Sequence, residues 1–153
     1  MGRAATKSLV PLVPHEGYHA YVDGSHYDDV TSFGLIVVRD DKVLVETGKV
    51  LPVTHEGTGS RQIIGELWGA MAAVQWMDRN EVHNFRLHYD YTGVRSWAEE
   101  FWKSRHWWTD EYVLFMAQAK VRVRWDKIDK SNENIYSQRV HDLANFARLA
   151  VHA

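Results

Sequence analysis

The sequence predicts a single α/β domain in which a mixed β-sheet carries helices on both faces. Three consecutive segments near the N-terminus have the patterns of β-strands, and the pattern then alternates between helices and strands. Antiparallel hairpins followed by βα units favour a sheet that is antiparallel in one part and parallel in the other. The length of 153 residues and the hydrophobic content of 45% suit one core rather than several domains.

The folded domain is expected to span 17–153. Residues 1–16 are small, polar or proline-containing and show no sustained period, so we expect an N-terminal tail. Three strands are then expected in succession: 18–23, 32–38 and 43–51. The second and third strands are rich in β-branched residues, and the polar segment between them predicts a hairpin turn.

Further along the chain, apolar residues recur at helical spacing. The first long helix is expected over 63–74, after a glycine-rich loop at 54–59 and with Ser60 as its N-cap. The remaining expected elements are a strand at 84–90, helices at 92–102 and 110–119, a strand at 121–128 and a helix at 135–151. The predicted sheet therefore has five strands, three before the first long helix and two after it.

Composition restricts the chemistry that the chain can perform. The absence of cysteine excludes disulfides, thiolate metal sites and cysteine nucleophiles. The formal net charge of -2 gives a nucleic-acid partner no support from overall electrostatics. Apolar stretches fall short of the ~18 residues that span a bilayer, and no signal-peptide pattern is present. We expect a cytoplasmic monomer without a membrane partner.

Three carboxylates occupy unusual places in the predicted fold. Asp23 is expected to end the first strand, Asp90 to end the fourth, and Glu66 to lie in the first turn of the first long helix. Because the first and fourth strands can lie parallel and adjacent, the three side chains can converge. Clustered carboxylates repel one another unless a divalent cation compensates, so the cluster predicts Mg²⁺ or Mn²⁺. Taken singly, each acid could also be a cap or a solvated strand end.

Four motifs carry a resemblance to a known family. They are Tyr-Val-Asp-Gly-Ser at 21–25, Gln-Ile-Ile-Gly-Glu-Leu at 62–67, His-Tyr-Asp-Tyr-Thr-Gly-Val at 88–94 and Val-His-Asp-Leu-Ala at 140–144, with Trp97, Trp102 and Lys103 after the third. In this order and spacing, the sequence resembles type 1 ribonuclease H of the bacterial and phage kind, which is related to the ribonuclease H domains of reverse transcriptases. The resemblance covers nearly the whole predicted domain.

The resemblance implies both a fold and an activity. The fold would be the ribonuclease H-like five-stranded mixed sheet, with three antiparallel strands followed by two parallel ones. The activity would be hydrolysis of the RNA strand of RNA/DNA hybrids, with Asp23, Glu66 and Asp90 holding two Mg²⁺ ions. The products would carry a 5′-phosphate and a 3′-hydroxyl. Family members select the RNA strand through its 2′-hydroxyls, so we expect little sequence specificity.

Five further positions are candidates for substrate contact: Gly24, Ser25, Gln62, Trp102 and Lys103. Main-chain groups at Gly24 and Ser25 can approach the RNA backbone, and Gln62 matches a position where relatives use an amide to reach the minor groove. Trp102 and Lys103 belong to a basic and aromatic segment that could follow a phosphate backbone. The tryptophans of that segment could instead pack helices together.

Two positions depart from the usual pattern of the family. His141 stands where the fourth site residue is usually aspartate, and Asp142 follows it. Relative to the apolar stripe of the predicted helix, His141 lies on the flank and Asp142 points away. We therefore expect an Asp-Glu-Asp-His cluster that prefers Mn²⁺, with a core-edge histidine as the alternative. Ser131 replaces a loop histidine that relatives use in turnover, so slower turnover or a substitute group is expected.

Two other functional classes remain open at the level of sequence. The fold could serve as a catalytically weak or inactive module that binds hybrid or duplex, as His141 and the missing loop histidine would allow. The three retained acids argue against this, because a decayed site has no need of mutually repelling carboxylates. The chain could also be another nuclease of the same fold, a junction resolvase or an integrase-like enzyme, some of which use a histidine in the fourth position.

Overall fold

The computed structural model describes residues 9–10, 15–52 and 61–151. The glycine-rich loop expected at 54–59, the N-cap expected at Ser60 and most of the expected tail lie outside the described residues. Within the described part of the chain, no helix is both long enough and apolar enough to cross a membrane.

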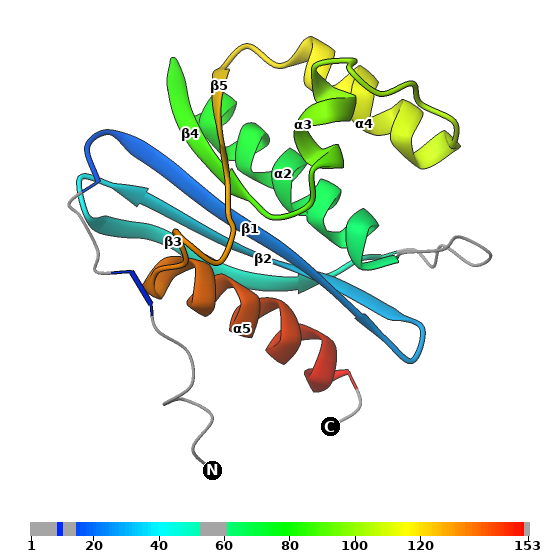
Figure 1. Cartoon of the computed structure of the whole chain (residues 1–153), viewed down its shortest axis with the longest axis horizontal. Helices are drawn as coiled ribbons and strands as arrows, with labels where there is room; N and C mark the ends of the chain where they lie inside the picture. Colours follow the sequence, from blue (N-terminus) through cyan, green and yellow to red (C-terminus); the bar gives the residue numbers. More distant parts are fainter. Residues whose placement is uncertain (1–8, 11–14, 53–60, 152–153) are drawn as a thin grey trace.

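The protein is built on one five-stranded sheet (Figure 1). Its strands are β1 (Tyr18–Tyr27), β2 (Val30–Arg39), β3 (Lys42–Val50), β4 (Asn84–Tyr89) and β5 (Arg122–Lys127). Their order in the sheet is β3-β2-β1-β4-β5. Strands β1, β2 and β3 pair antiparallel, whereas β4 pairs parallel with both β1 and β5. The mixed sheet predicted from the sequence is therefore confirmed.

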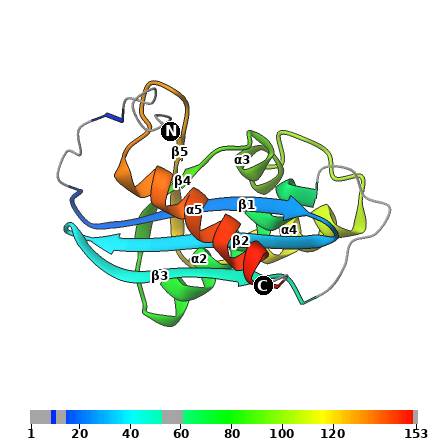
Figure 2. The ribbon, with the colours of Figure 1, turned by 90° about the horizontal axis from the view of Figure 1, so that it is seen from below.

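Helices cover both faces of this sheet. They are α2 (Arg61–Arg79), α3 (Gly93–Ala98), α4 (Trp107–Gln118) and α5 (Ile135–Ala150). Helix α5 crosses one face and α2 lies on the other, as the view in Figure 2 shows. Asn134 caps α5, because its side-chain oxygen accepts hydrogen bonds from the backbone N–H groups of Tyr136 and Ser137.

Each face of the sheet buries its own apolar cluster. The cluster under α2 includes Val22, Leu67 and Phe85, all at most 1% exposed. The cluster under α5 includes Ile36 and Val140. Burial on both faces explains why β2 is apolar without alternation from Leu35 to Val38.

Two glycines let the helices approach the sheet beside the predicted acids. A Cβ atom at Gly24 would lie 2.1 Å from the carbonyl oxygen of Gln62, in α2. A Cβ atom at Gly34 would lie 2.3 Å from the carbonyl oxygen of Val140, in α5. Any side chain at these positions would push a helix away, so both glycines set the distance between the sheet and the helices.

Some predicted boundaries are wrong, and the error at Asp23 has a physical reason. Strand β1 continues through Gly24 and Ser25 to Tyr27, so Asp23 lies inside the strand, paired with Gly34, and not at its end. The hairpin turn comes later, at Asp28 and Asp29, whose φ angles are 52° and 62°. Gly24 resembles a turn residue in the sequence, but its missing side chain makes room for α2 instead.

The helices also differ from the expected ranges. Because α2 begins at Arg61, Glu66 lies in its second turn and not in its first. Helix α3 ends at Ala98, four residues before the predicted end, and Glu100 adopts a φ of 59° just after it. Helix α4 begins at Trp107, earlier than predicted. The basic and aromatic segment therefore lies mostly in the connection between α3 and α4.

Candidate active site

The sheet brings the three predicted acids to one place. Tyr21 of β1 is the partner of His88 of β4 across the parallel pair, so Asp23 and Asp90, each two residues further on, emerge side by side. Glu66 approaches from α2. All three line one cleft, together with Gly24, Gln62, Ile63, Tyr91, Thr92 and Lys127. We call this the carboxylate cleft.

Glu66 is the most deeply buried of the three acids, with 4% of its surface exposed. Its Oε2 accepts hydrogen bonds from the backbone N–H groups of Asp90, at 2.7 Å, and Tyr91, at 3.1 Å. Burial, and then the neighbouring Asp23 carboxylate, raise the pKa of Glu66 to about 8. The two backbone hydrogen bonds oppose this shift without cancelling it.

Asp23 lies between Glu66 and helix α5. Its Oδ1 accepts a hydrogen bond from the backbone N–H of Gly24 at 2.9 Å, and its Oδ2 lies 2.8 Å from Nδ1 of His141. Desolvation, and then the Asp23 carboxylate, also raise the pKa of Asp90. The pKa values of Glu66 and Asp90 are therefore raised mainly by burial and by the neighbouring Asp23 carboxylate.

The donor set fits a hard divalent cation. Three carboxylates from β1, α2 and the end of β4 share the cleft, and oxygen ligands are what Mg²⁺ and Mn²⁺ prefer. A bound cation would favour the ionised forms of Glu66 and Asp90, against the shifts that burial and mutual repulsion produce. The residues present therefore suit the metal that the fold implies.

A chain of hydrogen bonds determines the tautomer of His141. Arg148 donates from Nε to Oγ of Ser25 at 2.8 Å, and Ser25 donates to Oδ1 of Asn145 at 2.7 Å. The amide nitrogen of Asn145 is 3.2 Å from Nε2 of His141. Because that amide nitrogen can only donate, Nε2 accepts and the ring proton lies on Nδ1, which donates to Asp23.

Helix α5 directs His141 toward the acids and Asp142 elsewhere. The His141 side chain is 53% exposed and contacts Asp23, whereas Oδ1 of Asp142 accepts a hydrogen bond from Gln138 at 3.2 Å. The periodicity of the helix predicted these directions, with His141 on the flank of the apolar stripe and Asp142 pointing away from it.

The predicted substrate residues fall into two groups. Gly24 and Gln62 line the carboxylate cleft, whereas Ser25 is 9% exposed and its hydroxyl is engaged in the chain to His141. Trp102 and Lys103 line a separate hollow with Trp97, Phe101, Arg105 and His106. The ring of Tyr91, which lines the carboxylate cleft, lies 6.1 Å from the Trp102 ring, so the two hollows are neighbours.

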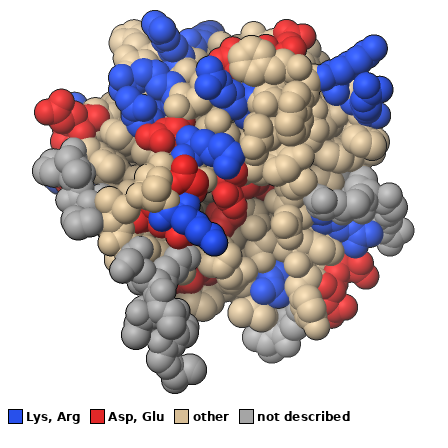
Figure 3. Space-filling model, in the orientation of Figure 1, with Lys and Arg blue, Asp and Glu red and all other residues tan. Residues whose placement is uncertain are grey.

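Several residues at the site were not predicted from the sequence. Asn145 and Arg148 complete the chain to His141, and only the spacing of four residues from His141 to Asn145 could have suggested the first of them. Lys127 lines the carboxylate cleft and also the adjoining cleft between the β5–α5 loop and α5, which includes Asp129, Lys130 and Glu133. Figure 3 shows acidic side chains gathered near the centre of one face, with lysine and arginine side chains beside them.

Similarity to known proteins is found in structure and not in sequence. No model of a protein family matches the chain, and no curated protein matches its sequence. Solved structures do match. Ribonuclease H1 from the halophilic archaeon Halobacterium salinarum NRC-1 is 17% identical, with a TM-score of 0.68 over 89% of this chain and 98% of that one.

Two further structures give the same result. The N-terminal ribonuclease H domain of a Mycobacterium tuberculosis protein is 16% identical, with a TM-score of 0.68 over 90% of this chain and 99% of that one. LC11-RNase H1, solved in complex with an RNA/DNA hybrid, is 11% identical, with a TM-score of 0.70 over 89% and 99%. The chain thus has the fold of type 1 ribonuclease H, as its motifs predict.

Proposed function

We propose that this protein is a metal-dependent endoribonuclease that hydrolyses the RNA strand of RNA/DNA hybrids. The observation that carries the proposal is the convergence of Asp23, Glu66 and Asp90 on one cleft of a ribonuclease H fold. The similarity to LC11-RNase H1, which was solved with a hybrid, supports this class of substrate. Fold alone would not be enough, because one fold hosts many functions.

The proposed cofactor is Mg²⁺ or Mn²⁺, with two ions in the presence of substrate. Asp23, Glu66 and Asp90 would hold them, with His141 as a ligand or a near neighbour. Divalent ions held there would supply activation of the attacking water and neutralisation of the charge that develops on the leaving 3′ oxygen. Hydrolysis breaks the bond between phosphorus and that oxygen, so the products carry a 5′-phosphate and a 3′-hydroxyl.

The residues of the chain orient these groups before substrate arrives. Two backbone N–H groups hold Glu66, and His141 holds one oxygen of Asp23. Lys127, on the rim of both clefts, supplies a positive charge for the phosphate being cut. Preorganised groups of this kind lower the barrier because they need little rearrangement during the reaction.

The proposed substrate contacts explain why cleavage would show little sequence preference. Gly24 and Gln62, in the carboxylate cleft, would reach the sugar and backbone of the hybrid, and Trp102 with Lys103 would follow the phosphate backbone beyond Tyr91. The hydroxyl of Ser25 is already engaged within the protein, so its contact would come from main-chain groups.

The test uses a uniformly labelled RNA/DNA hybrid with Mg²⁺, with Mn²⁺ and with chelator. Single-stranded RNA, duplex DNA and a four-way junction serve as alternative substrates. Asp90→Asn removes one carboxylate of the cleft, and Asp110→Asn, an exposed acid on α4, is the matched control. We expect cleavage of the RNA strand only, abolished by chelator and by Asp90→Asn but retained in Asp110→Asn.

Other outcomes would contradict the proposal in distinguishable ways. Hybrid binding without cleavage in either metal would favour a binding module of the same fold. Cleavage of the junction in preference to the hybrid would favour a resolvase or an integrase-like enzyme. Cleavage that survives chelation would remove the metal from the mechanism.

A further inference from the structure

A cluster of histidines lies next to the candidate active site, on the α5 face of the sheet. It consists of His15, His19 and His88, each of which offers a ring nitrogen within 4.8 Å of the other two. His19 and His88 are each 7% exposed. His88 stands two residues before Asp90 and pairs with Tyr21, which stands two residues before Asp23.

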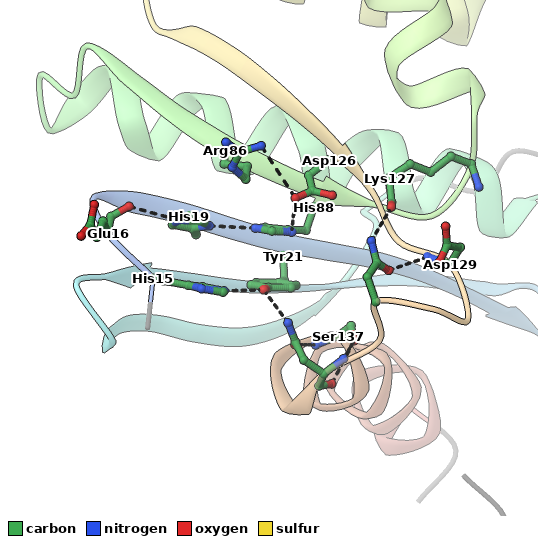
Figure 4. Close-up of polar contacts among 12 residues, drawn as sticks. His15, Glu16, His19, Tyr21, Arg86, His88, Asp126, Lys127, Asp129 and Ser137 are labelled. Carbon is green, nitrogen blue, oxygen red and sulfur yellow. Dashed lines mark hydrogen bonds and ion pairs between the residues drawn. The ribbon is translucent and has the colours of Figure 1, made fainter. Parts of the chain in front are cut away.

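The cluster consists of two stacked rows, which Figure 4 shows one above the other. In one row, His19 and His88 lie between the Glu16 carbonyl and Asp126. In the other row, His15 contacts the hydroxyl of Tyr21. The ring of His15 stacks on His19 at 4.1 Å, and the ring of Tyr21 stacks on His88 at 4.0 Å.

The contacts of the first row restrict where the ring protons of His19 and His88 can lie. Nε2 of His19 lies 3.1 Å from the Glu16 carbonyl oxygen, an acceptor, so it carries the ring proton. Nδ1 of His19 is then a lone pair, and it faces Nε2 of His88 at 2.8 Å. On the far side of His88, Nδ1 lies 3.6 Å from Oδ2 of Asp126.

A neutral His88 satisfies the hydrogen bond of this row with its proton on Nε2, which then donates to Nδ1 of His19. The 3.6 Å between Nδ1 of His88 and Asp126 is too long for a hydrogen bond. With the proton on Nδ1 instead, two lone pairs face each other at 2.8 Å, and a cation between the two rings would favour that tautomer. Burial and then His15 lower the pKa of His19 to about 4.

The second row places a third imidazole, that of His15, beside the first two. The amide of Asn134 donates to the Tyr21 hydroxyl at 2.9 Å. That hydroxyl therefore donates its own proton to Nε2 of His15, 2.6 Å away. Nε2 of His15 is thus an acceptor that the Tyr21 hydroxyl engages, and a cation bound to this nitrogen would replace that hydrogen bond. Ring nitrogens of all three histidines lie within 4.8 Å of one another.

We propose that His15, His19 and His88 form a binding site for a transition-metal cation of the Zn²⁺ or Co²⁺ type, distinct from the carboxylate cleft. Neutral imidazoles suit these ions, whereas the oxygen ligands of the cleft suit Mg²⁺ and Mn²⁺. A cation bound to the inner nitrogens leaves the outer protons of His19 and His88 for the Glu16 carbonyl and Asp126. Histidines that bind metals commonly donate the other ring N–H to such an acceptor.

Binding requires a defined rearrangement. Zinc binds imidazole nitrogen at about 2.0–2.1 Å and in the plane of the ring, so His19 and His88 move apart and His15 tilts out of its stack. His15 precedes β1 and is only half-buried, which leaves it room to turn. The bound ion would then tie the segment before β1 to β4, beside the strand positions that present Asp23 and Asp90.

The test is a titration of the metal-free protein with Co²⁺ in the presence of excess Mg²⁺, followed by the visible absorption of the Co²⁺ ion and by the unfolding temperature with Zn²⁺. We expect one Co²⁺ ion per chain, a spectrum typical of nitrogen ligands and a higher unfolding temperature. His15→Ala should weaken binding at least about tenfold. His83→Ala, at an exposed histidine just before β4, is the matched control and should bind as the wild type does.

Two further variants make the result decisive. Asp90→Asn disables the carboxylate cleft, and Co²⁺ binding should persist in it. His19→Gln keeps a side chain that can hydrogen-bond, so it should fold and yet lose affinity. Unchanged binding in both His15→Ala and His19→Gln, loss of binding in Asp90→Asn, or no binding by the wild type would each overturn the proposal. None of these readouts depends on nuclease activity.

Discussion

Replacement of Glu66 by glutamine tests the electrostatics of the carboxylate cleft directly. The pKa of Glu66 is about 8 in the folded protein, against 4.5 for an unperturbed group, because the side chain is buried beside Asp23. The folded state therefore holds the proton more tightly than the unfolded state does. The contribution of Glu66 to stability is therefore greatest below about pH 4.5, falls as pH rises, and levels off above about pH 8.

The difference in stability between Glu66→Gln and the wild type follows from the pKa shift of Glu66. The pKa shift of Glu66 corresponds to about 5 kcal/mol in the free energy of unfolding. Relaxation of the protein and entry of water around the ionised carboxylate reduce the part of this energy that an experiment would measure. Glutamine is neutral at every pH, and its amide oxygen can still accept from the backbone N–H groups of Asp90 and Tyr91. We expect Glu66→Gln to exceed the metal-free wild type in stability by about 2 to 5 kcal/mol at pH 9, and to match it near pH 5.

The assay is urea unfolding followed by tryptophan fluorescence, in chelator, from about pH 5 to about pH 9.5. Glu111→Gln, at an exposed glutamate on α4, is the control and should follow the wild type. Mg²⁺ should stabilise the wild type more than Glu66→Gln, because the cation favours the ionised carboxylate. A difference between the two proteins that is independent of pH, or a less stable variant at pH 9, would refute the reasoning.

Three further substitutions test other parts of the site and its support. Asn145→Ala removes the donor to Nε2 of His141, a hydrogen bond worth about 0.5–1.5 kcal/mol, so hybrid cleavage should slow about two- to tenfold while the urea midpoint changes little. Gly24→Ala places a methyl group 2.1 Å from the Gln62 carbonyl oxygen, which should cost about 1–3 kcal/mol or more in urea unfolding and abolish cleavage. Asp78→Ala leaves two backbone N–H groups just before β5 without their carboxylate acceptor, which should cost about 1–3 kcal/mol in thermal unfolding without changing the cleavage rate per folded molecule. Equal effects of Asn145→Ala and Asp78→Ala on cleavage would contradict the positioning role of the amide.

Local patterns in the sequence were sufficient for the sheet and for the three acids. Strand and helix periods are local properties, and the βα connections allow the first and fourth strands to lie parallel and adjacent. The end of β1 was not predictable in the same way. Gly24 and Ser25 form a turn signal, but the approach of α2 to within 2.1 Å of a Cβ at Gly24 is a tertiary effect that no neighbouring residue reveals.

The histidine row was hidden for a similar reason. Alternation in β4 places Arg86, His88 and Asp90 on one face, opposite the apolar residues, and such a face is usually solvated. Here helix α5 and the segment before β1 cover part of that face, so His88 is buried while Asp90 emerges into the cleft. The contact between Ser25 and Asn145 spans 120 positions, far beyond the reach of any local pattern.

The histidine at position 141 changes the electrostatics of the whole cleft. An aspartate there would add a fourth negative charge beside Asp23 and would raise the pKa values of Glu66 and Asp90 further. The imidazole ring instead donates a hydrogen bond to Asp23, and Asn145 holds the ring in the orientation that allows this. Carboxylates in the metal-free cleft therefore repel one another less than four carboxylates would. As a result, the first cation to bind gains less electrostatic free energy than it would in a four-carboxylate cleft. For the same reason, His141→Asp should strengthen the binding of Mg²⁺ while it destabilises the metal-free protein.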